Sequence, residues 1–204
     1  MSRHTVNSDM ESRSMSTDTL PATAKTSDLV IRDADPSDIA AITTIYRHHV
    51  LTGTASFEEI PPSETEITNR FDAIRGYGLP YLVALRDDVI VGYCYASLYR
   101  PRSAYRHTVE NSIYVAPDCI GNGIGAALMA ALLERCEAGP WRQMVAAIGD
   151  SKNHASIALH RKFGFDMTGT FHNVGYKFGT WLDSVMMQRP LGSDKPVIPG
   201  PADK

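Results

Sequence analysis

The stretch from residue 109 to residue 136 constrains the fold of this chain most, because it joins a β-rich run, a glycine-rich loop and a helical pattern. The run VENSIYV (109–115) favours a strand, and Gly121, Gly123 and Gly125 precede an apolar helical face. Such a loop places backbone N–H groups beside a helix N-terminus, where they favour phosphate or pyrophosphate. The loop lacks the Gly-Lys-Ser/Thr end of a nucleotide P-loop and the GxGxxG spacing of dinucleotide sites, so a glycine turn that only starts a helix is the alternative.

Strand and helix patterns alternate on both sides of this stretch, which indicates one mixed α/β domain built on a single sheet. Asp35-Pro36 marks a helix start, Ser63 with Glu66 marks a second, and Asp87-Asp88 marks a hairpin turn. Strands are expected at 28–32, 81–85, 89–98, 109–115, 144–148, 165–170 and 184–188. Helices are expected from Pro36 to near Gly53, from Ser63 onward, from Ile124 to before Gly139, and over 153–162.

The charge balance and the cysteines exclude several classes of function. Lys and Arg number 20 against 23 Asp and Glu, a net charge of -3, whereas nucleic-acid-binding domains usually carry a basic excess. No apolar stretch reaches the roughly 18 residues of a membrane span. Cys94, Cys119 and Cys136 lack CxxC spacing, so neither a disulfide framework nor a zinc site is indicated. We expect a cytoplasmic protein that binds no nucleic acid, no membrane and no metal.

The two ends of the chain differ in composition from its middle. Residues 1–28 are rich in Ser and Thr, poor in large apolar side chains, and lack the apolar core of a secretory signal. Residues 190–204 carry four prolines. We therefore expect a disordered N-terminal tail over 1–28, one folded domain over 29–189, and a loose proline-rich tail over 190–204. The middle part is long enough to bury a full hydrophobic core.

A second informative segment opens with Asn153 and closes with a Gly-Phe pair at 164–165. With the glycine loop, it resembles the GCN5-related N-acetyltransferase (GNAT) superfamily, whose acetyl-CoA loop reads Gln/Arg-x-x-Gly-x-Gly/Ala and whose next helix opens with Asn and closes with Gly-Phe. The glycines of that pattern fall on Gly123 and Gly125, and its basic position falls on Ile120, a departure. The resemblance implies a single GNAT-type domain, with a mixed, mostly antiparallel twisted sheet flanked by helices, and acetyl-CoA as co-substrate.

Four segments resemble a narrower group of this superfamily, the phosphinothricin and methionine sulfoximine or sulfone N-acetyltransferases. They are TASF (54–57), YRPRSAYRHTVENSIYV (99–115), LH (159–160) and GYKFGTWLD (175–183). The resemblance also implies a homodimer in which the last segment completes the acceptor site of the partner.

The site residues of this group map onto the chain position by position. The resemblance assigns the acceptor site to four residues: Phe57, Arg100, Arg102 and Tyr105. It assigns proton transfer to an acid/base pair: Glu110 and His160. It assigns acetyl-CoA binding to the end of a strand, the glycine loop and two helix starts: Ile113, Tyr114, Val115, Gly121, Asn122, Gly123, Ile124, Gly125, Ala126 and Asn153.

The chemistry of these residue types agrees with such roles. An α-amine, with a reference pKa of about 8, must lose a proton before attack, and partial burial would raise the pKa of Glu110 toward a useful value. The alternative is a solvent-facing Glu110 or one paired with an arginine. His160 is expected to protonate the CoA thiolate or act as a second base, with a hydrogen-bonded core histidine as the alternative. Arg100 and Arg102, two apart in an extended strand, suit a carboxylate or phosphinate, with a solvated basic patch as the alternative.

These observations predict an N-acetyltransferase that moves the acetyl group of acetyl-CoA directly to the α-amine of a small amino-acid analogue in a ternary complex. Methionine sulfoximine, methionine sulfone and phosphinothricin are the expected acceptors. Two alternatives stay open: a different amine as acceptor, and a non-catalytic acetyl-CoA sensor. Arg100 and Arg102 disfavour a polycationic acceptor by repulsion, and the presence of both Glu110 and His160 disfavours the sensor.

Overall fold

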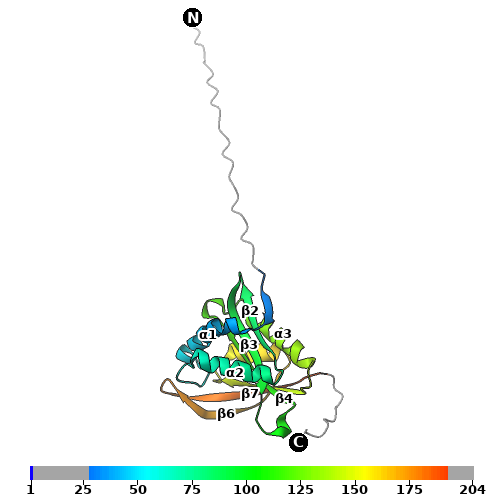
Figure 1. Ribbon diagram of the computed structural model, residues 1–204. Helices are drawn as coiled ribbons and strands as arrows, with labels where there is room; N and C mark the ends of the chain where they lie inside the picture. The colour runs from blue at the N-terminus through cyan, green and yellow to red at the C-terminus, as the bar shows by residue number, and fades with distance from the viewer. Residues whose placement is uncertain (2–27, 193–204) are drawn as a thin grey trace.

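The computed structural model describes Met1 and residues 28–192. Within these residues, seven strands form one sheet in the order β1-β2-β3-β4-β5-β7-β6 (Figure 1). Every neighbouring pair is antiparallel except β4 and β5, which are parallel. The α/β fold with a mixed, mostly antiparallel sheet flanked by helices is therefore confirmed. Most of the expected tails over 1–28 and 190–204 lies outside the described residues, so their boundaries stay a prediction.

The elements follow one another in the order that the sequence pattern indicates. The strands are β1 (Val30–Asp33), β2 (Tyr81–Arg86), β3 (Val89–Leu98), β4 (Thr108–Val115), β5 (Gln143–Gly149), β6 (Asp166–Lys177) and β7 (Thr180–Pro190). The α-helices are α1 (Ile39–Thr52), α2 (Glu64–Gly76), α3 (Ile124–Glu137) and α4 (His154–Lys162). Three short 3-10 turns are η1 (Pro36–Asp38), η2 (Ser103–Tyr105) and η3 (Pro117–Cys119). No helix in the described part of the chain is both long enough and apolar enough to span a membrane.

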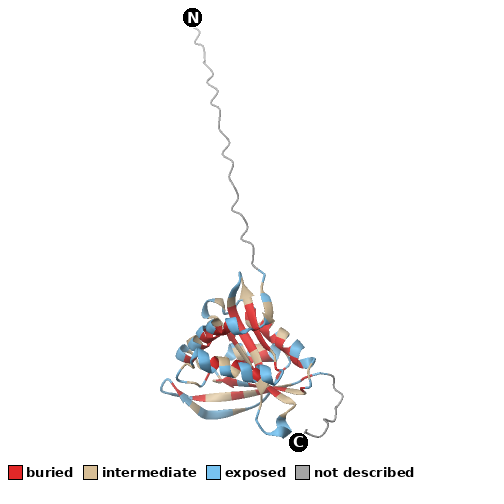
Figure 2. Ribbon diagram, in the orientation of Figure 1, coloured by how far each residue is buried: buried red, intermediate tan, exposed pale blue. Residues whose placement is uncertain are grey.

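Helices cover both faces of the sheet around β3 and β4. A Cβ added at Gly92 would lie 3.1 Å from Leu128 of α3, so this face of β3 meets α3 closely. The next residue, Tyr93, points to the opposite face and stacks on Tyr114 of β4 at 5.3 Å. Tyr114 in turn meets the ring of Tyr46 on α1 at 5.0 Å. Figure 2 shows the buried residues concentrated where the sheet meets these helices.

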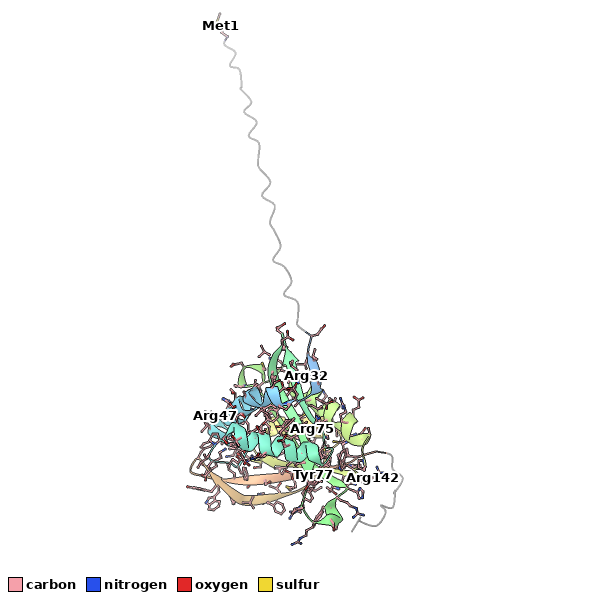
Figure 3. All side chains as sticks on the ribbon, in the orientation of Figure 1. Met1, Arg32, Arg47, Arg75, Tyr77 and Arg142 are labelled. Atoms are coloured by element: carbon pink, nitrogen blue, oxygen red, sulfur yellow. The ribbon has the colours of Figure 1, made fainter. Side chains whose placement is uncertain are left out.

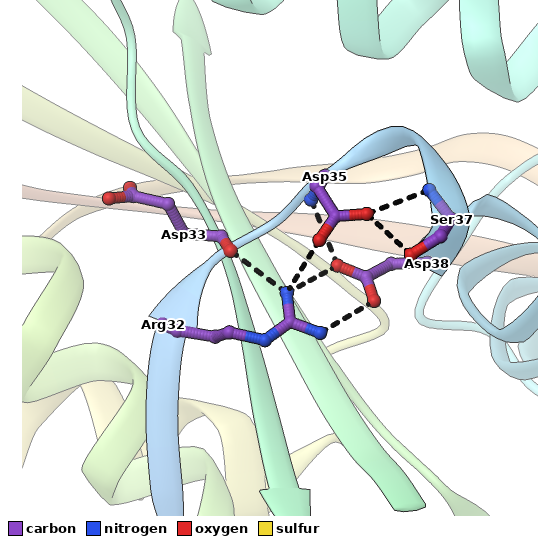
Figure 4. Close-up of polar contacts among 5 residues, drawn as sticks. All are labelled: Arg32, Asp33, Asp35, Ser37 and Asp38. Carbon is purple, nitrogen blue, oxygen red and sulfur yellow. Dashed lines mark hydrogen bonds and ion pairs between the residues drawn. The ribbon is translucent and has the colours of Figure 1, made fainter.

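The start of the first helix is held by a polar network (Figure 4). The Asp35 carboxylate accepts a hydrogen bond from Ser37 N at 2.8 Å, and Asp38 accepts one from Asp35 N at 2.9 Å. Arg32 donates to both carboxylate oxygens of Asp38 at 2.6 and 2.8 Å, and this hydrogen bonding lowers the pKa of that buried carboxyl. The helix start predicted at Asp35-Pro36 is thus confirmed, as the 3-10 turn η1 that leads into α1.

The second predicted helix start and the first predicted hairpin are also present. Ser63 Oγ accepts a hydrogen bond from Glu66 N at 3.2 Å and so caps α2. In the last turn of α2, Arg75, labelled in Figure 3, lies with its guanidinium carbon 5.9 Å from the centre of the Phe71 ring. Between β2 and β3, residues 87–88 adopt φ angles of 51° and 60°, as a tight two-residue hairpin turn requires.

The last two strands are much longer than the sequence pattern predicts. In place of short strands at 165–170 and 184–188, β6 and β7 form one long hairpin, drawn in orange in Figure 1, that pairs from Asp166 opposite Gln188 to Lys177 opposite Thr180. Turn-forming residues between these ranges favour a loop. Pairing nevertheless continues across them, with a register shift between Phe171 and Gly175 that places Asn173 at a φ of 53°. The segment GYKFGTWLD is therefore the outer end of this hairpin.

Candidate active site

The candidate site lies where β4 and β5 separate. Their parallel pairing ends with Glu110 opposite Val145, although β4 continues to Val115 and β5 continues to Gly149. The two strand ends therefore diverge and leave an opening in the middle of the sheet. A cavity of about 970 Å³ occupies this opening and is lined by elements from both faces of the sheet.

The unpaired edge of β4 presents backbone groups to this cavity. Bonding directions alternate along an antiparallel strand, and Ala116 N donates to Val91 O on the β3 side. The N–H and C=O groups of Ile113 and Val115 therefore point away from β3, toward the opening. His49 Nε2 lies 2.8 Å from Val115 O and donates to it, which is consistent with that direction. This edge suits an extended ligand that carries amide groups.

Most of the residues that the resemblance assigns to a site line this one cavity. Twelve of them do so: Phe57, Glu110, Ile113, Tyr114, Val115, Gly121, Gly123, Ile124, Gly125, Ala126, Asn153 and His160. Asn122 lies in the same glycine loop without lining the cavity, and three acceptor-site candidates lie apart from its wall: Arg100, Arg102 and Tyr105.

The glycine loop ends at the N-terminus of α3, which begins at Ile124. Gly121 and Gly123 have φ angles of 86° and 78°, a region that other residue types rarely adopt. A Cβ at either position would meet nothing within 4 Å, so backbone conformation, rather than lack of space, requires glycine here. The N–H groups of the first helical turn lack helical partners and make this end of the cavity suited to phosphate.

Glu110 lies on the face of β4 that it shares with Ser112 and Tyr114, because side chains alternate along a strand. That face meets α1, and the cavity wall there continues into the loop after α1, through residues 55–58. Glu110 is half-buried, and its burial raises the pKa of the carboxyl, while the charge of Arg100 lowers it by less. A carboxyl with a raised pKa is well placed to exchange a proton with an amine near neutral pH.

His160 is 5% exposed and lies on the opposite side of the sheet, on α4. Its Nδ1 lies 2.8 Å from Ser156 O, and because a carbonyl only accepts, Nδ1 carries the proton. Its Nε2 then accepts a hydrogen bond from Asn111 Nδ2 at 3.0 Å, and burial lowers the pKa of the imidazole. Both ring nitrogens are occupied inside the protein, which favours the hydrogen-bonded core histidine over a free proton donor.

The two arginines predicted to bind the acceptor do not share a strand face. β3 ends at Leu98, and Pro101, which has no N–H to donate, lies between Arg100 and Arg102. The guanidinium of Arg100 packs over the ring of Tyr99 at 5.0 Å, and both arginines are exposed in the loop before β4. The expected extended arrangement is therefore wrong, and within one chain the loop presents Arg100 and Arg102 to solvent.

Sequence reasoning missed two groups that shape the cavity. Asn111 is 7% exposed, and its Oδ1 has no hydrogen-bond partner among the described residues. His49 fixes the end of β4 through Val115 O, although 66 positions separate the two residues. The alternation of side chains along a strand places Asn111 on the opposite face of β4 from Glu110 and could have identified it. No sequence signal connects His49 with β4.

Comparisons with known proteins agree with this geometry. The acetyltransferase (GNAT) domain family matches residues 31–186. The chain is 55% identical over 170 residues to a phosphinothricin N-acetyltransferase of Alcaligenes faecalis, covering 83% of this chain and 85% of that protein. It is 43% identical over 165 residues to an L-methionine sulfoximine/L-methionine sulfone acetyltransferase of Pseudomonas aeruginosa, covering 79% and 94%.

A solved structure extends the agreement to three dimensions. It is the crystal structure of a phosphinothricin acetyltransferase from Sinorhizobium meliloti in complex with acetyl-CoA. The two structures superpose with a TM-score of 0.82 at 47% sequence identity, over 85% of this chain and 94% of that chain. The chain therefore belongs to the GNAT family and is an acyltransferase with acetyl-CoA as its co-substrate.

Proposed function

We propose that this protein acetylates the α-amine of a small amino-acid analogue, with phosphinothricin, methionine sulfoximine and methionine sulfone as its acceptors. The observation that carries the proposal is the cavity between β4 and β5, which places Glu110 on one side of the sheet and the glycine loop on the other. Relatives at 55% and 43% identity are named for these acceptors and support the choice.

Acetyl-CoA enters from the side of α3 and α4. Its pyrophosphate binds the N–H groups of Gly121 to Ala126, and its pantetheine arm runs along the open edge of β4 from Ile113 to Val115. Asn153 at the start of α4 adds a side-chain amide on the same side. This arrangement leaves the thioester at the centre of the opening, within reach of an amine that enters from the side of Glu110.

Glu110 removes a proton from the ammonium group of the acceptor, directly or through a water molecule. The free amine then forms a bond with the acetyl carbon, while backbone N–H groups around Val115 stabilise the negative charge that develops on the carbonyl oxygen. The carbon–sulfur bond breaks, and the second proton of the amine passes to the sulfur as the amide forms. The reaction therefore balances with one proton on Glu110, which is released to solvent.

In this scheme His160 holds Asn111 in place on the α4 side of the cavity. Neither of its ring nitrogens has to leave its present hydrogen bond, to Ser156 O or to Asn111 Nδ2. This role replaces the proton donor that the sequence resemblance implies. It also fits the lowered pKa of the imidazole, which keeps the ring neutral near pH 7.

We further propose that the protein works as a homodimer joined through the β6–β7 hairpin. Large apolar side chains point to solvent along this hairpin, and such patches commonly mark protein interfaces. Their exposed fractions range from 45% to 61%: Met167, Phe171, Val174, Tyr176, Phe178 and Trp181. In the dimer, Arg100, Arg102 and Tyr105 complete an acceptor site together with the partner's hairpin, where the guanidinium groups bind the acidic groups of the acceptor.

A cytoplasmic location belongs to the same proposal. Cys94, Cys119 and Cys136 are all free thiols, which suits a reducing compartment.

The experiment that tests the proposed function follows release of CoA from acetyl-CoA with a thiol reagent. The acceptors are phosphinothricin, methionine sulfoximine, methionine sulfone, ordinary amino acids, spermidine and an aminoglycoside. The proposal predicts saturable release with the first three and none with the two polycations. Saturable release with spermidine alone would identify a different acceptor class, and binding of acetyl-CoA without release on any acceptor would favour a sensor.

A further inference from the structure

Lys177, the last residue of β6, is a buried cation that takes no part in the proposed acetyl transfer. The residue is 2% exposed. Its Nζ donates hydrogen bonds to two backbone carbonyls in the loop after α1, Gly53 O at 2.8 Å and Ser56 O at 2.7 Å. A buried ammonium group is costly unless it is paired or hydrogen-bonded, so this contact ties the loop to the hairpin with a definite geometry.

The loop that Lys177 holds rests directly on the backbone of two strands. A Cβ added at Gly149 of β5 would lie 2.0 Å from Thr54 O, so no side chain fits between the loop and this strand. A Cβ added at Gly175 of β6 would lie 2.4 Å from the ring of Phe57. The loop therefore packs against the backbone of Gly149, and the ring of Phe57 packs against the backbone of Gly175.

The other side of the same loop is held by helices α1 and α2. Tyr46 of α1 lies 2.9 Å from Ser56 Oγ and donates to Glu58 at 3.0 Å. Glu58 also accepts from Arg70 of α2 at 2.7 Å. Since residues 55–58 line the cavity on the side of Glu110, the loop forms a wall of the acceptor end of the site.

We propose that Lys177 is a positioning residue that sets the affinity for the acceptor by holding the loop over residues 53–57 against the β6–β7 hairpin. This inference rests on the proposed function, because it treats the Glu110 end of the cavity as the acceptor site. Acetyl-CoA binds at the other end, on the glycine loop and α4, which Lys177 does not touch. Loss of the Lys177 contacts therefore affects one substrate and spares the other.

The test compares Lys177→Met with wild type in steady-state kinetics. Methionine keeps the length of the side chain but leaves two carbonyls without a donor. The KM for phosphinothricin should rise about tenfold, equivalent to roughly 1.4 kcal/mol, while the KM for acetyl-CoA and the turnover at saturation stay within about twofold. Lys177→Arg, which keeps the charge and the donors, should recover part of the loss. Lys152→Met, at an exposed lysine that does not line the cavity, is the matched control and should behave as wild type.

A second variant keeps the test independent of how well Lys177→Met folds. Gly175→Ala displaces the ring of Phe57 without removing a charge, and it should raise the KM for phosphinothricin in the same way. An unchanged acceptor KM in Lys177→Met, or a fall in kcat alone at constant KM, would overturn the inference, because a merely structural role lowers the active fraction and leaves KM unchanged.

Hydrogen exchange separates failure of this inference from failure of the proposed function. If the wild-type protein acetylates none of the acceptors, the proposed function fails. The stability of the loop can still be measured by amide hydrogen exchange, which needs no turnover. The amides of residues 53–58 should exchange about tenfold faster in Lys177→Met, with β3 and β4 unchanged. Equal exchange of these amides in the variant and in wild type would show that Lys177 does not hold the loop.

Discussion

Glu110 and Asn111 are adjacent on β4, and the strand turns them to opposite faces of the sheet. Glu110 lines the end of the cavity that we propose binds the acceptor, whereas Asn111 Nδ2 lies 3.0 Å from His160 Nε2 of α4. The sequence predicted a role for Glu110 because its place before the glycine loop carries the family resemblance. It did not predict the contact between Asn111 and His160, because 49 positions separate these two residues.

His160→Gln tests whether the histidine positions Asn111 or donates a proton to the CoA thiolate. We expect turnover to fall less than tenfold and the free energy of unfolding to fall by about 1–3 kcal/mol, since a buried hydrogen-bonded group is replaced. Steady-state kinetics and denaturant unfolding measure the two effects. If turnover instead falls by about two orders of magnitude or more while stability is intact, His160 is the proton donor.

The same variant has a pH signature in stability. Burial lowers the pKa of His160 in the folded protein, so the unfolded chain takes up the proton first as the pH falls below about 6.5. The stability that neutral His160 contributes is therefore present above that pH and is lost as the pH falls through the folded pKa. Wild type should lose more stability between pH 7 and pH 5 than His160→Gln, and equal slopes would contradict this assignment.

At the scale of elements, the site depends on where two strands stop pairing and where two helices start. The glycine pattern and the Asn153 cap predicted the starts of α3 and α4, because capping is a local property of the sequence. The separation of β4 from β5 after Glu110 was not predictable in this way, since register depends on partners far along the chain. The length of the β6–β7 hairpin escaped prediction for another reason, because turn-forming residues such as Asn173 and Gly175 lie within the paired strands.

Asn153 combines a helix cap with a proposed contact to acetyl-CoA, and two substitutions separate these roles. Its Oδ1 accepts a hydrogen bond from Ser156 N at 3.2 Å. Asn153→Ala should lower stability by about 1 kcal/mol and also weaken acetyl-CoA binding. Asn153→Asp keeps the capping oxygen but loses the amide N–H, so stability should be kept while the Kd for acetyl-CoA rises, measured by titration calorimetry. An Asp variant that binds acetyl-CoA as well as wild type would limit Asn153 to capping.

At the scale of the whole molecule, one sheet provides both the active site and an exposed apolar surface. The loop over residues 53–57 packs against the backbones of β5 and β6. β6 and β7 carry exposed aromatic side chains at the edge of the sheet. The family resemblance predicted the architecture, and nine of the ten residues it assigns to acetyl-CoA line the cavity, whose glycine loop is a local motif. Their contacts with acetyl-CoA stay a prediction. The residues that the resemblance assigns to the acceptor are less well gathered, since in a single chain Arg100 and Arg102 lie apart from the cavity wall.

The proposed dimer is tested by placing a charge on the exposed hairpin. Trp181, 61% exposed, should lie within the interface. Trp181→Asp should therefore yield a monomer by sedimentation velocity, whereas wild type should have twice the 22.4 kDa mass of one chain. Val89, 62% exposed at the distant β2–β3 turn, provides the matched control, and Val89→Asp should remain a dimer. A wild-type monomer, or a dimeric Trp181→Asp, would rule out this interface.

The most direct test of the whole account is Glu110→Gln, measured by turnover of phosphinothricin, by acetyl-CoA binding and by unfolding at pH 7.5. Burial raises the pKa of Glu110, so its contribution to stability is present below about pH 4.3 and is lost as the pH rises through the folded pKa. A neutral glutamine should therefore leave stability equal or higher at pH 7.5. We expect turnover to fall by about 10²–10⁴-fold while acetyl-CoA binding is unchanged. Turnover within threefold of wild type would contradict the account, because the acceptor would then lose its proton without Glu110.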